Sequence, residues 1–146
     1  MTTTQKQTFL TDMLYVLQQA RAFREYNRLC PSGYLGSGHP FETTVRNALI
    51  ESSLSFLRKV NEFFGKNSEA SAVAFFPDYQ SQWLWTKEDC ELLNNRVMHL
   101  SLCHAIEGDY DWTVFLATHL PEAEKRFDEF MSRVRLEQPE LLTSKG

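Results

Sequence analysis

The sequence predicts an all-α fold, an antiparallel four-helix bundle with a kinked fourth helix. Three observations lead to this prediction: apolar side chains recur at helical spacing in four stretches, most links between these stretches are short, and no stretch shows the alternation typical of a strand. The chain has 146 residues, the usual size of one domain. We therefore expect a single helical-bundle domain over residues 1–146, with frayed ends at 1–7 and 137–146.

The first two predicted helices are separated by a glycine-rich loop. Apolar spacing predicts a helix over residues 8–29, which ends before Pro31. Residues 31–40 hold three glycines, but no strand precedes them and no known phosphate-binding motif is present, so we interpret them as a connector. The second helix is predicted over residues 41–64, and Gly65 stands where a C-terminal glycine belongs.

An aromatic segment follows the second helix. Residues 75–85 hold five aromatic side chains around Pro77, without the periodicity of a regular helix. One interpretation is a loop that packs over the end of the bundle. The other is a stacking platform or partner-docking patch, with Trp83 and Trp85 as its anchors.

The last two helices are predicted in the second half of the chain. Thr86 is a suitable N-cap for a third helix over residues 86–107, which Gly108 would end. The fourth starts within residues 109–111 and keeps one apolar phase across Pro121. Because the phase is continuous, we expect one kinked helix rather than two helices.

Composition limits the classes of function. Hydrophobic residues make up 42% of the chain and the net charge is −4, so it lacks the overall basic character of many nucleic-acid binders. A local basic row remains in the first helix, where Arg21, Arg24 and Arg28 follow helical spacing. These arginines either pair with carboxylates on a solvated face or contact phosphate.

Cysteine usage and hydropathy bear on the compartment. The three cysteines form no CxxC pair, which argues against a disulfide framework. The first residues contain no apolar leader, and no apolar run approaches the ~20 residues of a membrane span. We therefore expect a cytoplasmic protein without a membrane segment.

The densest group of reactive side chains lies in residues 94–104. His99 and Cys103 are four residues apart on one predicted helix face and could hold a metal ion, with a further ligand from His39, His119 or Cys90. No HExxH or ExxH pair completes such a site. We therefore expect no metal and no cofactor, and keep a metal-binding bundle as an alternative.

Proton transfer is another interpretation of the same stretch. His99 lies within about one turn of Asn95 and Arg96. A histidine beside an amide and a guanidinium can exchange a proton with a phosphodiester while the cation holds the phosphate. Alternatively, Asn95 and Arg96 hydrogen-bond a neighbouring helix and position His99 structurally.

Residues 94–99, Asn-Asn-Arg-Val-Met-His, resemble the late-helix motif of the HEPN superfamily of small helical bundles. In that motif an arginine, usually followed by a polar residue, precedes a histidine by roughly four to six residues. Asn95 matches the polar position and His99 the histidine, whereas Asn94 stands at the arginine position. Arg96 is too close to His99 for this spacing. The resemblance implies an RNA-cleaving, nucleotide-binding or non-catalytic bundle, with the active site completed across a dimer, and Asn94 argues against cleavage.

These observations together lead us to expect a HEPN-like homodimer that contacts RNA or a nucleotide without a full catalytic motif. If it is an enzyme, the resemblance implies a metal-independent endoribonuclease. The candidate catalytic residues are His99, Arg96 and Asn95, and the candidate phosphate-binding residues are Arg21, Arg24 and Arg28. The alternative is a non-enzymatic protein-interaction or regulatory module that uses Trp83 and Trp85.

Overall fold

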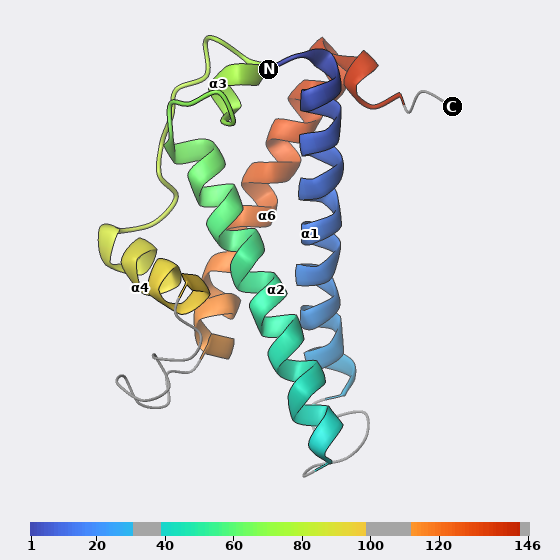
Figure 1. Ribbon diagram of the computed structural model, residues 1–146, viewed down its shortest axis with the longest axis vertical. Coiled ribbons are helices and arrows are strands. Elements are labelled where there is room, and N and C mark those ends of the chain that lie inside the picture. The colour runs from blue at the N-terminus through green and yellow to red at the C-terminus, as the bar shows by residue number, and fades with distance from the viewer. Residues whose placement is uncertain (31–38, 99–111, 144–146) are drawn as a thin grey trace.

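Three long helices dominate the structure. The computed structural model describes residues 1–30, 39–98 and 112–143, with backbone alone for 95–98, and these residues form helices and connecting loops without any strand. In Figure 1, α1 (Thr3–Leu29), α2 (Pro40–Gly65) and α6 (Trp112–Glu137) lie side by side. The shorter α4 (Lys87–Met98) lies across α2 on the side away from α1. The prediction of an all-α fold is therefore confirmed.

The first helix begins earlier than expected. The sequence predicts frayed residues up to 7, but α1 starts at Thr3 because Thr2 and Gln5 form a capping box. The Gln5 backbone N–H donates to Thr2 Oγ1 at 3.2 Å, and the Thr2 backbone N–H donates to Gln5 Oε1 at 2.8 Å. This reciprocal pair satisfies two backbone donors that a helix N-terminus otherwise leaves free.

Helices α2 and α6 follow the ranges predicted for the second and fourth helices closely. His39 caps α2 through its imidazole, which accepts the Phe41 backbone N–H at 3.3 Å, and Pro40 occupies the first turn, where its missing N–H costs no hydrogen bond. The last helix is continuous from Trp112 to Glu137 with Pro121 inside it. The prediction of one helix across Pro121, rather than two, is therefore confirmed.

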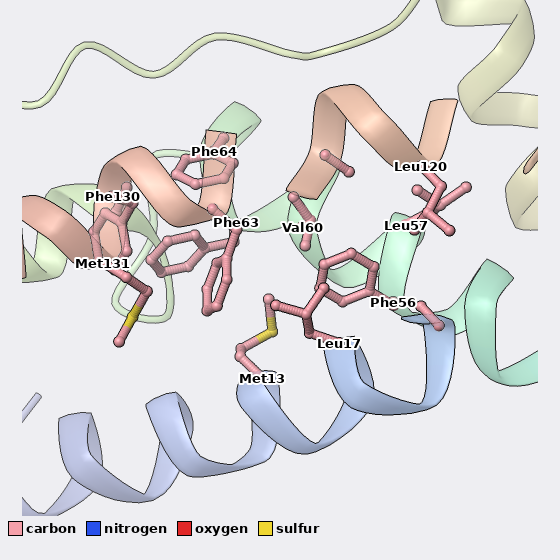
Figure 2. Close-up of a cluster of buried hydrophobic side chains, with 14 of the residues drawn as sticks. Met13, Leu17, Phe56, Leu57, Val60, Phe63, Phe64, Leu120, Phe130 and Met131 are labelled. Atoms are coloured by element: carbon pink, nitrogen blue, oxygen red, sulfur yellow. The ribbon is translucent and has the colours of Figure 1, made fainter. Parts of the chain in front are cut away.

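Large apolar side chains from α1, α2 and α6 fill the core (Figure 2). Toward the C-terminal end of α2, the Phe63 ring has its centroid 4.9 Å from that of Phe130 of α6 and 5.1 Å from that of Phe9 of α1. Two helical turns earlier on α2, the Phe56 ring meets the Phe127 ring of α6 edge to face, with centroids 6.3 Å apart. Such pairs contribute beyond their area burial, so α2 is held between its two long neighbours by interlocked rings.

One end of the molecule is closed by short elements that the sequence did not predict. The helix α3 (Ala72–Phe75) buries Phe75 against the Phe63 and Phe130 rings. The 3₁₀ turn η1 (Pro139–Leu141) buries Leu141, and Gln7 donates its side-chain amide to the Glu140 carbonyl at 2.9 Å.

Residues 139–143 therefore lie against the first turns of α1, while fraying of the tail stays a prediction. Leu141 is buried as part of the hydrophobic core.

The expectation that the chain has no membrane segment concerns helix length and hydropathy. None of the described helices is both long and apolar enough to span a membrane.

Candidate functional site

A groove of about 310 Å³ lies between α2 and α4. Trp83 and Trp85, from the segment that leads into α4, form part of its lining. The remaining lining residues come from the two helices: Arg58, Asn61, Glu62 and Lys66 from α2, and Lys87, Cys90, Leu93 and Asn94 from α4. A volume near 300 Å³ is at the lower end for small-molecule sites, so the groove suits one small ligand or one unit of a polymer.

Trp83 is held as an exposed aromatic platform. Its side chain is 47% exposed, yet one face of the ring lies against the backbone of Gly65. A Cβ at position 65 would come within 2.3 to 2.8 Å of three indole carbons, far inside van der Waals contact.

Gly65 therefore has a different role from the one that its position suggested. It is the last residue of α2, and the capping residue Lys66 has ordinary extended backbone angles. The glycine leaves room for an indole ring, whereas the sequence had suggested a C-terminal cap.

The aromatic segment is attached to α2 by three hydrogen bonds. The Gln82 backbone N–H donates to the Phe64 carbonyl at 2.8 Å, and Ser81 Oγ donates to the Lys66 carbonyl at 3.2 Å. The Leu84 backbone N–H donates to Asn61 Oδ1 at 2.9 Å. The ring of Trp83 consequently projects from a backbone that is held on both sides.

Asn61 also connects α2 to α4. Its side chain is buried, and its Nδ2 donates to Cys90 Sγ at 2.9 Å. Burial raises the pKa of the Cys90 thiol, although the hydrogen bond from Asn61 opposes the rise. Cys90 is therefore a neutral thiol near pH 7, unsuited to nucleophilic attack without a change in its surroundings.

Charges around the groove are mainly positive. Of the described side chains that line it, Arg58, Lys66 and Lys87 are the cations and Glu62 is the one carboxylate. Glu62 Oε1 accepts from Arg58 Nε at 3.3 Å, while Glu62 Oε2 lies 3.2 Å from Lys66 Nζ. Lys87 is 84% exposed and 3.5 Å from Glu91, a surface pair of small energetic value. An incoming phosphate can therefore compete for Lys87 at little cost.

Trp85 has a different environment from Trp83. It is buried, its ring meets the His119 ring at 5.2 Å, and its Nε1 is a buried donor with no hydrogen-bond acceptor in the described part of the chain. Burial lowers the pKa of His119, which Asp89 at 3.8 Å partly opposes. Of the two predicted anchors, Trp83 thus offers a ring to solvent and Trp85 supports the groove from within.

The arginine row of α1 is engaged by carboxylates of α6. Arg21 Nε lies 3.1 Å from Glu124 Oε1, and Arg24 donates to the other oxygen of the same carboxylate. Glu124 is buried, so this pair of arginines compensates its charge. Arg28 pairs with Glu25 on α1 itself. Phosphate binding by this row stays a prediction, and it would compete with these ion pairs.

The side chains of the predicted catalytic group lie outside the part of the chain that the structure describes. His99 follows the last described residue of α4, and for Asn95 and Arg96 only the backbone is described. Asn94, which takes the arginine position in the HEPN-like alignment, is described and lines the groove. Within the described ranges no three His, Cys, Asp or Glu side chains gather closely enough to hold a metal ion.

Comparisons with protein-family models, with curated proteins and with solved structures each find no match to this chain. The chemistry of the groove is therefore what points to a function. Sequence reasoning did not select the lining residues Arg58, Asn61, Lys66 and Lys87. The i, i+4 spacings that join Arg58 and Lys66 to Glu62 were a usable signal, but that spacing is common on any solvated helix face.

Proposed function

We propose that the groove between α2 and α4 binds a nucleotide, either free or as one unit of a single-stranded RNA, and that the protein acts by binding rather than by cutting. The observation that carries this proposal is an exposed indole ring, backed by Gly65, beside three cations. Aromatic platforms flanked by basic side chains bind single strands, since a base stacks on the ring while cations meet the phosphates.

The resemblance to HEPN bundles supports the same class of ligand. Asn94 lines the groove, and the predicted motif continues from it along the chain to His99. An asparagine at this position can hydrogen-bond a phosphate or a base but brings no positive charge. Binding without cleavage is the consequence we expect, with Asn95, Arg96 and His99 as further contacts.

Other parts of the proposal concern assembly. We infer that the chain completes an antiparallel four-helix bundle, with a kink at Pro121 because proline removes a backbone hydrogen bond inside α6. We further infer a cytoplasmic homodimer, as in the HEPN resemblance. Sedimentation of the purified protein would measure the dimer directly, and a monomer at all concentrations would remove that part.

The proposal is tested by RNA binding. Fluorescence titration of a labelled single-stranded RNA should give saturable binding that weakens with salt. The variant Trp83→Ala should lose about tenfold in affinity or more, since stacking of one base contributes roughly 1–3 kcal/mol. Tyr15→Ala is the matched control, because Tyr15 is an exposed aromatic residue on α1 outside the groove. Equal binding by both variants would overturn the proposal.

A protein partner is the second candidate ligand. The exposed Trp83 favours it, because tryptophan is enriched among the residues that dominate interface energies. Binding of this kind would be insensitive to Lys87→Gln at the groove rim, whereas binding of RNA phosphates would weaken. A partner retained by wild type and lost by Trp83→Ala, together with no RNA binding, would select this candidate.

A further inference from the structure

We propose that the groove prefers guanine, with Glu62 as the residue that selects the base; this inference rests on the nucleotide-binding function proposed above. Among the residues that the structure describes, Glu62 is the one carboxylate in the lining of the groove. It lies three residues before Gly65 on α2, which places the two on the same face of the helix. Gly65 is the residue that the Trp83 ring covers, so the selecting carboxylate lies about one helical turn from the stacking platform.

The hydrogen-bonding capacity of Glu62 fits one base better than the others. Glu62 Oε1 accepts a hydrogen bond from Arg58 Nε, and Glu62 Oε2 forms an ion pair with Lys66 Nζ. A carboxylate oxygen has two lone pairs, so each keeps one acceptor position. Guanine carries two neighbouring donors, N1–H and the N2 amino group, on a single edge. These two donors match the two oxygens of a carboxylate.

The remaining bases lack this pair of donors. Adenine and cytosine place one amino donor beside a ring nitrogen acceptor, and uracil places one N–H between two carbonyl oxygens. Each of them would bring an acceptor against the carboxylate, where two negative groups repel and neither is hydrogen-bonded. Sites that hydrogen-bond a specific edge reject ligands without it strongly, because the polar groups are then left unpaired.

The cations of the groove have different roles. Arg58 and Lys66 pair with the two oxygens of the Glu62 carboxylate, which limits the freedom of this side chain. Lys87 is on α4, away from Glu62, and its only described partner is the surface carboxylate of Glu91 at 3.5 Å. Lys87 is therefore the cation that a nucleotide phosphate can most easily recruit while the base meets Glu62.

The test compares four mononucleotides on the full chain. Titration calorimetry with GMP, AMP, CMP and UMP should show GMP binding about tenfold more tightly than each of the others, the value of one charge-assisted hydrogen bond. Inosine monophosphate, which lacks the N2 amino group, should fall between GMP and AMP.

The variant Glu62→Gln gives opposite signs for different ligands. Binding of GMP should weaken about tenfold, because an amide offers one acceptor instead of two. Binding of AMP, CMP and UMP should hold or tighten, since the groove loses a negative charge. The matched control is Glu91→Gln, which removes a carboxylate beside Lys87 but outside the lining of the groove and should leave the guanine preference unchanged.

The outcomes separate the two proposals. The guanine inference is overturned if the wild-type protein binds all four mononucleotides equally. It is also overturned if the Glu62→Gln variant keeps the preference for GMP. In both cases the proposal of nucleotide binding still stands. If neither mononucleotides nor RNA bind, both proposals fail together. A thermal melt of Glu62→Gln that matches wild type shows that the variant is folded, and Glu62→Asp, whose carboxylate is one methylene shorter, provides a second variant that should also weaken GMP.

Discussion

The indole ring of Trp83 lies directly against the backbone of Gly65, so closely that no larger residue fits at position 65 without moving the ring. Gly65→Ala should therefore displace Trp83 and weaken RNA binding about tenfold, as in Trp83→Ala. The free energy of unfolding should change by no more than about 1 kcal/mol, since alanine is also a better helix former than glycine.

Two measurements check this first prediction: the tryptophan emission maximum and the affinity for RNA. The two substitutions should not add, because both remove one platform. An additive loss in the double variant Gly65→Ala/Trp83→Ala would show that the glycine acts in another way.

The buried carboxylate of Glu124 depends on the arginines of α1. In the double variant Arg21→Ala/Arg24→Ala, this charge stays buried without a cation, and the free energy of unfolding should fall by about 1–3 kcal/mol. Arg28→Ala removes only a surface pair and should cost less than about 0.5 kcal/mol. Urea denaturation measures both. RNA binding that falls in Arg28→Ala at unchanged stability would instead favour the phosphate role of this row.

Acid should destabilise the protein through His119. Burial lowers the pKa of this imidazole below its ordinary value of 6.5, so the unfolded chain takes up the proton first as the pH falls. The contribution to stability is therefore complete above pH 6.5 and is lost as the pH falls toward the lowered pKa of the folded state.

Melting temperatures between pH 5 and pH 8 measure this effect, with His119→Phe as the comparison. Phenylalanine keeps a ring between Trp85 and Phe115 but has no proton to gain, so the variant should lose less stability in acid. Parallel pH curves for the two proteins would show that His119 makes no such contribution.

Asn94 is the point at which the HEPN-like resemblance can be probed by restoring a residue. Asn94→Arg should tighten RNA binding several-fold and steepen its salt dependence by about 0.7 per added phosphate contact. Asn94→Gln is the neutral control. Cleavage that appears in Asn94→Arg and disappears on His99→Ala would support the catalytic interpretation of residues 94–99, while tighter binding without cleavage would support a binding role.

Cys90 reports on occupancy of the groove. Because burial raises its pKa, its alkylation by iodoacetamide at pH 7 should be slow and should accelerate as the pH rises. A bound nucleotide should protect Cys90, which lines the groove, and leave Cys30 on α1's C-terminal cap unaffected. Peptide mass spectrometry separates the two sites. Equal protection of both cysteines, or of neither, would place the ligand elsewhere.

Helical periodicity was sufficient to locate the long helices. The predicted ranges 8–29 and 41–64 differ from α1 and α2 by a few residues, because apolar spacing defines the buried face whereas capping groups decide the ends. The capping box of Thr2 and Gln5 lets α1 begin at Thr3, and hydrophobic periodicity carries no information about such a cap. The short α3 and the 3₁₀ turn were missed because their stability comes from tertiary burial of Phe75 and Leu141.

The groove was harder to predict than the helices. Trp83 was a candidate because it lies in a segment rich in aromatic residues, but the sequence could not distinguish it from Trp85, which is buried. Lys66 and Lys87 are separated by a segment that is irregular apart from the short α3, and only its path beside α2 brings them together. Glu62 stands four residues from both Arg58 and Lys66, a spacing typical of any solvated helix face, so the sequence could not indicate its place in a groove.

The contact between Gln7 and the Glu140 carbonyl has a practical meaning for anyone who handles this protein. It holds the first turns of α1 and the residues after α6 at one end of the long axis, remote from α4 (Figure 1). A purification handle, a fluorescent fusion or a surface tether attached at this end of the molecule would thus leave the groove between α2 and α4 open to solution.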